Sequence, residues 1–208
     1  MTSRFGVEMK AQTQIISAIL VFLVALAAVA LVLPWALTMV QKKKDMKNVD
    51  DVYNFFLKLD EVIRDVAKNG GEESLTLKVP GELTVYPDSS NHPYNNSITF
   101  SFLSKVSNIA VNVGEIPLNT PNQNSTATLG VDTPSVIFGK ANLTDDSILV
   151  QYRLWYRTLV DVDGDKFKIV LNTSENSILN STLGFVRVQR LGTRTVGDLT
   201  LTEINVIV

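Results

Sequence analysis

The sequence contains no cysteine and a single histidine, His92. Without cysteine the chain can form neither a disulfide framework nor a zinc site with thiolate ligands, and lipid attachment through a lipobox cysteine is excluded. A nucleophile–base pair would need this one histidine or a less common Ser–Lys or carboxylate arrangement. A glycine-rich phosphate-binding loop is also missing. We therefore expect a protein that is not an enzyme and that binds no cofactor.

A surplus of basic residues is missing as well. The formal net charge is −2 and the pI is about 5.4. Proteins that bind nucleic acids usually carry a basic surplus, so we expect no nucleic-acid partner.

No charged residue occurs between Ile15 and Val40. As a helix, this run of 26 residues is about 39 Å long, enough to cross a hydrocarbon core of about 30 Å. We expect this segment to insert into a membrane or to pack against identical helices. The residues expected to form its contact surface are Ile15, Ile16, Ile19, Leu20, Phe22, Leu23, Leu26, Val29, Leu33 and Pro34.

Glycine and proline are both missing from Trp35 to Asn69, so no residue there favours a helix end. Gly70–Gly71 follows and can adopt the left-handed conformation that commonly ends a helix. We therefore predict one long helix over residues 12–69. It is apolar on every side in residues 12–40 and amphipathic in residues 41–69.

The amphipathic half of this helix has a single apolar face. Its apolar residues recur at the i, i+3, i+4, i+7 spacing, and charged residues fill the opposite face. Because an apolar face is unstable in water, we expect it to pack on the sheet that follows Gly71. The residues of this face are Phe55, Phe56, Leu59, Val62, Ile63 and Val66.

Beyond Gly71 the apolar residues alternate with polar ones at a period of two, which predicts strands. The expected fold class is α+β, with the long N-terminal helix followed by an antiparallel β-sandwich-like domain over residues 72–208. Residues 116–133 are rich in Asn, Thr, Ser and Pro and are expected to form a long exposed loop. The expected strands are 74–79, 82–86, 98–103, 109–113, 135–138, 147–162, 166–171, 184–191 and 199–208.

Five Asn-x-Ser/Thr sequons lie in the β-rich part, a mild excess over the number that composition alone gives. They favour an exported domain. A count of positive charges favours the opposite orientation, because Lys42, Lys43, Lys44 and Lys47 follow the apolar run. We expect the domain to lie outside the cell. The candidate N-glycosylation sites are Asn95, Asn124, Asn142, Asn172 and Asn180.

The lysines after the apolar run have two interpretations. They are typical of an interfacial anchor that follows a membrane span. In a filament they could instead face acidic residues of a neighbouring copy, such as Asp50, Asp51 or Asp60.

Asp161, Asp163 and Asp165 surround Gly164 and resemble a calcium-binding loop. An EF-hand loop has its glycine at the sixth position and a glutamate at the twelfth. Here the glycine is fourth and Asn172 is twelfth. Because the segment joins two alternating runs, a hairpin turn is the competing interpretation.

Two sets of side chains alternate along the predicted strand around residue 155. The set expected in the core is Tyr152, Leu154 and Tyr156, and the set expected on the surface is Arg153, Trp155 and Arg157. The exposed set could form a subunit contact, since Trp and Arg are favoured in interfaces. The alternative is a cation–π pair on the domain surface.

Lys10 and Ala11 immediately precede the apolar run, and Gln12 opens a polar start that leads into it. With the long unbroken helix, this arrangement makes about the first 70 residues similar to the archaeal type IV pilin family, whose members carry class III signal peptides. The resemblance implies that a prepilin peptidase cleaves after Ala11. Residues 1–11 would then be a leader, and the mature chain would begin at Gln12. It also implies extraction from the membrane and stacking of the apolar helices into a filament core.

Together these features predict a structural subunit of a surface filament. The chain would lie in the cell membrane as a precursor and in an extracellular homo-oligomeric filament after assembly. Its other partners would be the prepilin peptidase and the membrane assembly machinery. The alternative is a single-span surface protein whose β-domain binds a ligand and does not polymerise.

Overall fold

The computed structural model describes the backbone of residues 4–174 and 177–208, and the side chains of residues 16–174 and 177–208. The chain divides into two compact units, residues 1–44 and residues 45–208. The described residues form one long helix and, after it, two β-sheets. The fold class is therefore α+β, as the sequence predicts.

Helix α1 extends from Arg4 to Asn69 without a break. It ends where the sequence predicts, because Gly70 has a φ of +81° and donates its backbone N–H to the Val66 carbonyl over 2.9 Å. Its start lies eight residues before the predicted start at Gln12. Lys10, Ala11 and Gln12 are part of the helical backbone, and their side chains, like that of Ile15, lie outside the described residues.

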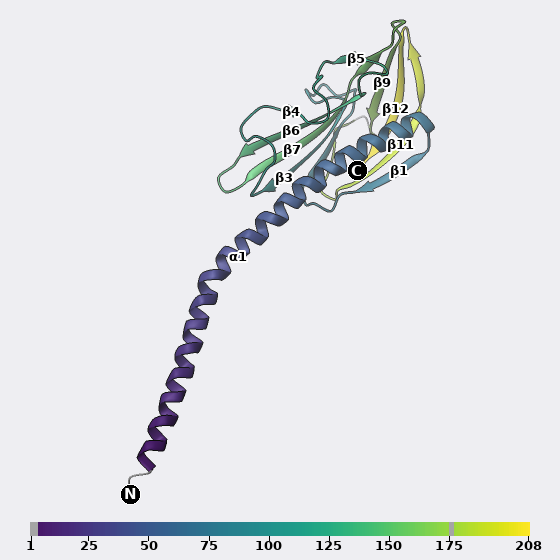
Figure 1. Ribbon diagram of the computed structural model, residues 1–208. Coiled ribbons are helices and arrows are strands. Elements are labelled where there is room, and N and C mark those ends of the chain that lie inside the picture. The colour runs from purple at the N-terminus through teal and green to yellow at the C-terminus, as the bar shows by residue number, and fades with distance from the viewer. Residues whose placement is uncertain (1–3, 175–176) are drawn as a thin grey trace. The chain divides into compact units, whose positions relative to one another are not determined.

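In the described part of the chain, twelve strands form two sheets of six (Figure 1). Sheet 1 contains, in spatial order, β1 (Glu72–Thr76), β11 (Phe185–Val196), β12 (Leu199–Ile207), β9 (Lys166–Asn172), β8 (Thr158–Val160) and β5 (Thr126–Thr128). Sheet 2 contains β10 (Leu179–Ser181), β2 (Glu82–Tyr86), β3 (Ser97–Ser104), β7 (Ile148–Tyr156), β6 (Ser135–Leu143) and β4 (Ile116–Pro117).

Most neighbouring strands are antiparallel, but β12 pairs with β9, and β5 with β8, in parallel. The sequence predicted an antiparallel domain throughout. The first exception arises because β12 returns from β11 in a hairpin and completes sheet 1 beside β9. Parallel neighbours need a long connection between them, and the residues from β9 to β12 supply one.

Several predicted strands differ from the structure. Residues 109–113 are not a continuous strand. The Ser107 hydroxyl accepts the Ile109 N–H over 2.9 Å, and the segment pairs with β6 only through an isolated bridge between Val111 and Ala141. The predicted loop 116–133 contains the short strands β4 and β5. The predicted strand 147–162 is two strands, β7 in sheet 2 and β8 in sheet 1, and Arg157 lies between them.

Residues 45–69 of α1 lie along the two sheets (Figure 1) and share one apolar core with them. All six residues of the apolar face are buried, and Phe56, Leu59 and Ile63 have no exposed surface. The ring of Phe56 lies 5.9 Å from that of Tyr152 on β7. Burying such side chains contributes about 1.5–3 kcal/mol each. The sheet residues of this core include Leu75, Val186 and Ile204 from sheet 1 and Leu83, Phe100 and Leu154 from sheet 2.

Candidate functional site

The most unusual surface of the molecule is the apolar part of α1. From residue 16 to residue 40, every large apolar side chain is at least 47% exposed, and Leu31 reaches 81%. The exposed residues include the predicted contact residues Ile16, Ile19, Leu20, Phe22, Leu23, Leu26, Val29 and Leu33. So large an apolar surface is unstable in water and needs either lipid or protein around it. The helix is long and apolar enough to cross a membrane.

A groove of about 330 Å³ lies on this surface beside Pro34. It is lined by apolar residues, namely Ala28, Val29, Val32, Leu33 and Ala36. The Thr38 hydroxyl donates a hydrogen bond of 2.9 Å to the Pro34 carbonyl, a side-chain-to-backbone contact that often bends helices. Small side chains such as those of Ala28 and Ala36 allow another helix to approach closely.

The lysines Lys42 to Lys44 are exposed, whereas the next residue, Asp45, is buried. The Asp45 carboxylate accepts the backbone N–H of Lys105 over 2.8 Å. This bond joins the beginning of the buried part of α1 to the segment that follows β3.

Asp60 is also buried, so the prediction that it could face the lysines of a neighbouring copy is wrong. Its carboxylate accepts the Tyr156 hydroxyl over 2.9 Å and forms an ion pair of 3.0 Å with Arg64 one turn later. Burial, reinforced by the negative charge of Asp60, raises the pKa of Tyr156 well above its ordinary value. Asp60 therefore joins the helix to Tyr156 of β7 in sheet 2.

Between the contacts of Asp45 and Asp60 along α1, the helix packs against Tyr152 of β7, which also makes a polar contact. The hydroxyl of Tyr152 donates to the Asn108 side chain over 3.3 Å, and the ring packs against Tyr53 and Phe56 of α1. Burial raises the pKa of Tyr152 to about 12. Tyr152, Leu154 and Tyr156 thus all lie in the core, where the alternation predicted them.

Asn96 joins the two sheets, a role that the sequence did not reveal. It is buried in a left-handed conformation with a φ of +55°. Its side-chain amide donates to the carbonyls of Tyr156 (3.0 Å) and Ile169 (2.9 Å), and its side-chain oxygen accepts the Leu171 N–H (2.8 Å). The one signal in the sequence is that Asn tolerates the left-handed region better than most residues.

The three residues predicted to be exposed on this strand, Arg153, Trp155 and Arg157, lie in two different environments. Arg153 pairs with Glu115 through Nε, 2.9 Å from one carboxylate oxygen, and through Nη2 with the other. Its guanidinium carbon lies 5.0 Å from the ring centroid of Tyr94 and 4.3 Å from that of Phe138. Arg153 therefore forms cation–π contacts, as one of the two interpretations predicted, but with Tyr94 and Phe138 as its partners.

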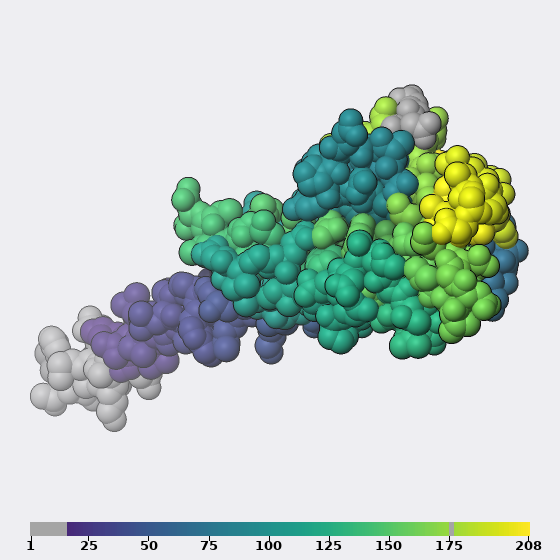
Figure 2. All heavy atoms as spheres, turned by 90° about the horizontal axis from the view of Figure 1, so that it is seen from above, coloured from purple at the N-terminus to yellow at the C-terminus, as the bar shows by residue number. Residues whose placement is uncertain are grey.

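A depression of about 450 Å³ lies above this cluster. Phe138, Arg153 and Trp155 of sheet 2 line it, together with Pro93 and Asn95 from one loop and Glu115 and Gln123 from another segment. In Figure 2 the loop around residue 90 is a raised dark teal lobe, next to the teal-green residues of the second segment.

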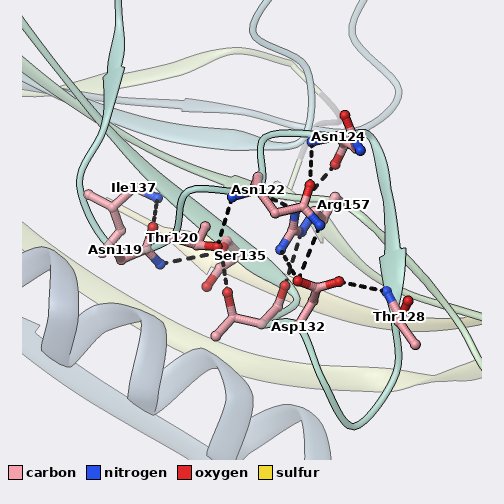
Figure 3. Close-up of polar contacts among 10 residues, drawn as sticks. Asn119, Thr120, Asn122, Asn124, Thr128, Asp132, Ser135, Ile137 and Arg157 are labelled. Carbon is pink, nitrogen blue, oxygen red and sulfur yellow. Dashed lines mark hydrogen bonds and ion pairs between the residues drawn. The ribbon is translucent and has the colours of Figure 1, made fainter.

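Arg157 was predicted to be exposed, but it is buried, with only 1% of its surface accessible. It occupies the point where the chain passes from sheet 2 to sheet 1, and it holds the 119–135 segment (Figure 3). Its guanidinium donates to the backbone carbonyls of Thr133 (3.0 Å), Asn122 (2.8 Å) and Asn124 (3.4 Å). The alternation of a straight strand could not reveal this position, since the strand ends at Tyr156.

Asp132 lies 3.9 Å from Arg157 and accepts two further bonds within the same segment. The backbone N–H of Thr128 donates to one carboxylate oxygen over 2.9 Å, and the Asn122 amide to the other over 3.2 Å (Figure 3). The Thr128 bond, followed by the Asn122 bond, lowers the pKa of Asp132. Residues 119–135 are thus an ordered segment with internal partners.

The acidic segment forms the turn between β8 and β9. The Asp161 carboxylate accepts the backbone N–H groups of Asp163 (2.9 Å) and Asp165 (3.0 Å), and Gly164 has a φ of +91°. Over residues 16–174 and 177–208, no three His, Cys, Asp or Glu side chains converge as a metal site would require. The sequence motif is explained by the turn.

The five sequons lie in different environments. Asn95, Asn124 and Asn180 are exposed, whereas Asn142 and Asn172 are half-buried on β6 and β9. In the first sequon Ser97 is fully buried, and its hydroxyl donates to the Tyr94 carbonyl.

Comparisons of the sequence with family models, with curated proteins and with solved structures found no match. The function therefore has to be inferred from the surfaces of the molecule itself.

Proposed function

We propose that this chain is a structural subunit of a surface filament of the type IV pilus kind, similar to archaeal pilins. It polymerises through the apolar part of α1 after cleavage between Ala11 and Gln12. The observation that carries the proposal is the exposure of apolar side chains on every side of residues 16–40. A membrane-anchored chain and a filament subunit both need such a helix, and a filament core surrounds it with identical helices.

The groove beside Pro34 supports helix–helix packing in particular. Lipid tails fill any apolar surface, but a groove with alanines at its ends matches a neighbouring helix that approaches closely. In a bundle of helices, neighbours also satisfy the backbone carbonyl that a proline leaves free. The occupant in this proposal is a second copy of α1.

The role is structural rather than catalytic. The ring of the one histidine, His92, stacks on Tyr86 with centroids 4.4 Å apart, and its Nδ1 accepts the Tyr94 N–H over 3.2 Å. These contacts brace the loop between β2 and β3. The partners in this proposal are identical copies, a prepilin peptidase and the assembly machinery, with glycans at exposed sequons.

A second candidate is a single-span surface protein that does not polymerise. Three exposed lysines directly after the apolar run favour it, because such residues anchor a span at the lipid headgroups. The β-domain would then act as a binding domain attached to the membrane.

Electron microscopy of sheared surface material, with N-terminal sequencing of its subunit, separates the two. The filament proposal expects filaments whose subunit begins at Gln12. A chain that stays with the membrane after shearing favours the second candidate. A subunit that begins at Met1 or near Ala28 contradicts the pilin-like processing.

A further inference from the structure

We infer that the depression above Arg153 and Trp155 is a binding site for a neutral saccharide. The site belongs to residues 45–208 and does not depend on polymerisation, so it goes beyond the proposed function. Its volume of about 450 Å³ lies within the range of about 300–1,000 Å³ that is typical of small-molecule sites.

The lining of the depression includes two aromatic rings. Trp155 is half-exposed, and its ring lies 6.4 Å from that of the buried Phe138. The C–H face of a pyranose ring is apolar and stacks on an indole, whereas its hydroxyl groups project from the rim of the ring. An aromatic platform with polar groups around it therefore has the form that a sugar ring requires.

The lining also supplies hydrogen-bonding groups. Asn95 and Gln123 bring carboxamides from two different segments, and both residues are exposed. Glu115 accepts bonds from Arg153 and keeps further lone pairs on both oxygens. Arg153 uses Nε and Nη2 for this pair, so in the described part of the chain its Nη1 donors have no protein partner. Planar groups of this kind bind neighbouring hydroxyls of a sugar in pairs.

The charge balance selects the class of ligand. Glu115 and Arg153 neutralise each other, so the depression attracts neither a strong anion nor a strong cation. An apolar peptide segment would cover both charged groups without replacing their water, which is unfavourable. A neutral saccharide provides hydroxyls for the same groups and an apolar face for the indole.

The site is also ordered before any ligand arrives. Arg153 is held by its pair with Glu115 and by the rings of Tyr94 and Phe138, and Tyr94 in turn contacts His92 edge-to-face at 5.4 Å. A site whose side chains are already fixed loses little conformational entropy on binding. The small loss of conformational entropy offsets the weaker contact that a shallow depression makes with a ligand.

The test uses the whole chain, purified in detergent from a host that does not attach N-glycans. It is applied to an array of neutral and acidic saccharides, and the best neutral ligand is then titrated. Trp155→Ala and Gln123→Ala should each weaken binding roughly tenfold or more. The matched control is Phe167→Ala, which removes a half-exposed aromatic ring from β9 of sheet 1 and should leave binding unchanged.

Failure to bind any neutral saccharide above background overturns the inference, as does equal affinity of wild type and both variants. If Trp155→Ala does not fold, Gln123→Ala still decides the question, because Gln123 is an exposed residue. Loss of saccharide binding leaves the filament proposal untouched, since filaments are scored separately by microscopy.

The saccharide could come from another surface or from the chain itself, since Asn95 lines the depression. A second arm compares chains from a glycosylating host. If a glycan on Asn95 fills the site, added saccharide binds more weakly to the glycosylated chain than to the chain from the host that attaches no N-glycans. If the ligand is external, the two preparations bind it equally.

Discussion

The two parts of α1 belong to one continuous helix but have opposite surroundings. Between residues 16 and 40 its large apolar side chains are exposed on all sides, whereas between residues 45 and 69 they are buried along one face. The backbone is helical in both parts, although the surroundings of their side chains differ. What differs is the distribution of apolar residues, which run all round the first part and form one stripe on the second.

The comparison shows which part has its partner inside the chain. The stripe of the second part finds its partner in the two sheets, and Asp45 and Asp60 add polar contacts at its beginning and middle. Residues 16–40 contain no charged residue, so no side of this part of the helix is distinguished as the one that packs. Its partner has to surround it, as lipid or a bundle of helices does.

The largest expected effect comes from placing a charge in the first part. Leu26→Lys should abolish filaments, because burying an unpaired ammonium in a close-packed core costs several kcal/mol for each subunit. Filaments are counted by electron microscopy, and immunoblots of the membrane fraction verify insertion and processing. The matched control is Leu103→Lys, which adds the same charge at a residue of β3 that is already 65% exposed. Wild-type filaments from a normally inserted and processed Leu26→Lys chain would show that this helix is not the assembly element.

A smaller effect is expected from removing apolar atoms in the second part. In a fragment of residues 45–208, Leu59→Ala should lower the free energy of unfolding by about 2–5 kcal/mol, since it removes buried methyl groups and leaves a cavity. Leu57→Ala removes the same atoms two residues earlier, where the side chain is 39% exposed, and should cost less than about 1 kcal/mol. Urea denaturation measures both. Coincident curves for the two variants would mean that the stripe is not packed on its own domain.

The polar contact of the second part should appear in the pH dependence. The pKa of Tyr156 is higher in the folded than in the unfolded chain, so its contribution is complete below about pH 10 and decreases as the unfolded tyrosine ionises above it. Between about pH 10.5 and 11.5, the free energy of unfolding should fall faster for wild type than for Tyr156→Phe, by roughly 1 kcal/mol per pH unit. Denaturation of the same fragment at several pH values tests this. Parallel pH profiles would show that Tyr156 ionises equally easily in both states.

The smallest effect is expected on the solvated face of the second part. Lys58→Ala, next to the buried Leu59, should change the free energy of unfolding by no more than about 0.5 kcal/mol, because Lys58 is exposed. The measurement is again urea denaturation of the fragment. A loss comparable to that of Leu59→Ala would mean that both faces of the helix are covered.

The helix and most strands could be predicted from the sequence because their determinants are local. Spacing of apolar residues and the pair Gly70–Gly71 define the helix and its end, and alternation defines strands such as β2 and β3. The parallel pairing of β9 with β12 joins segments separated by the whole of β10 and β11, and no local pattern specifies it. Residues 109–113 show the reverse failure, since their apolar pattern is typical of a strand but they form only an isolated bridge to β6, after a local turn at Ser107.

The polar contacts were harder to predict than the core. Arg157 and Asn96 have the composition of surface residues, and their burial depends on carbonyl groups that other segments bring to them. The Arg153 cation–π contact was predicted in kind, but its partners Tyr94 and Phe138 come from a loop and from β6. Alternation identifies the face of a strand that a residue occupies, not the segment that covers it.

The anchoring of the 119–135 segment has a consequence for sequence variation. Arg157 holds it mainly through backbone carbonyls, those of Asn122, Asn124 and Thr133, which every amino acid possesses. Exposed side chains such as Gln123 and Ser125 can therefore be exchanged without loosening the anchor. A surface built in this way can drift in sequence, and so change what it presents to ligands or antibodies, while the path of its backbone is inherited unchanged.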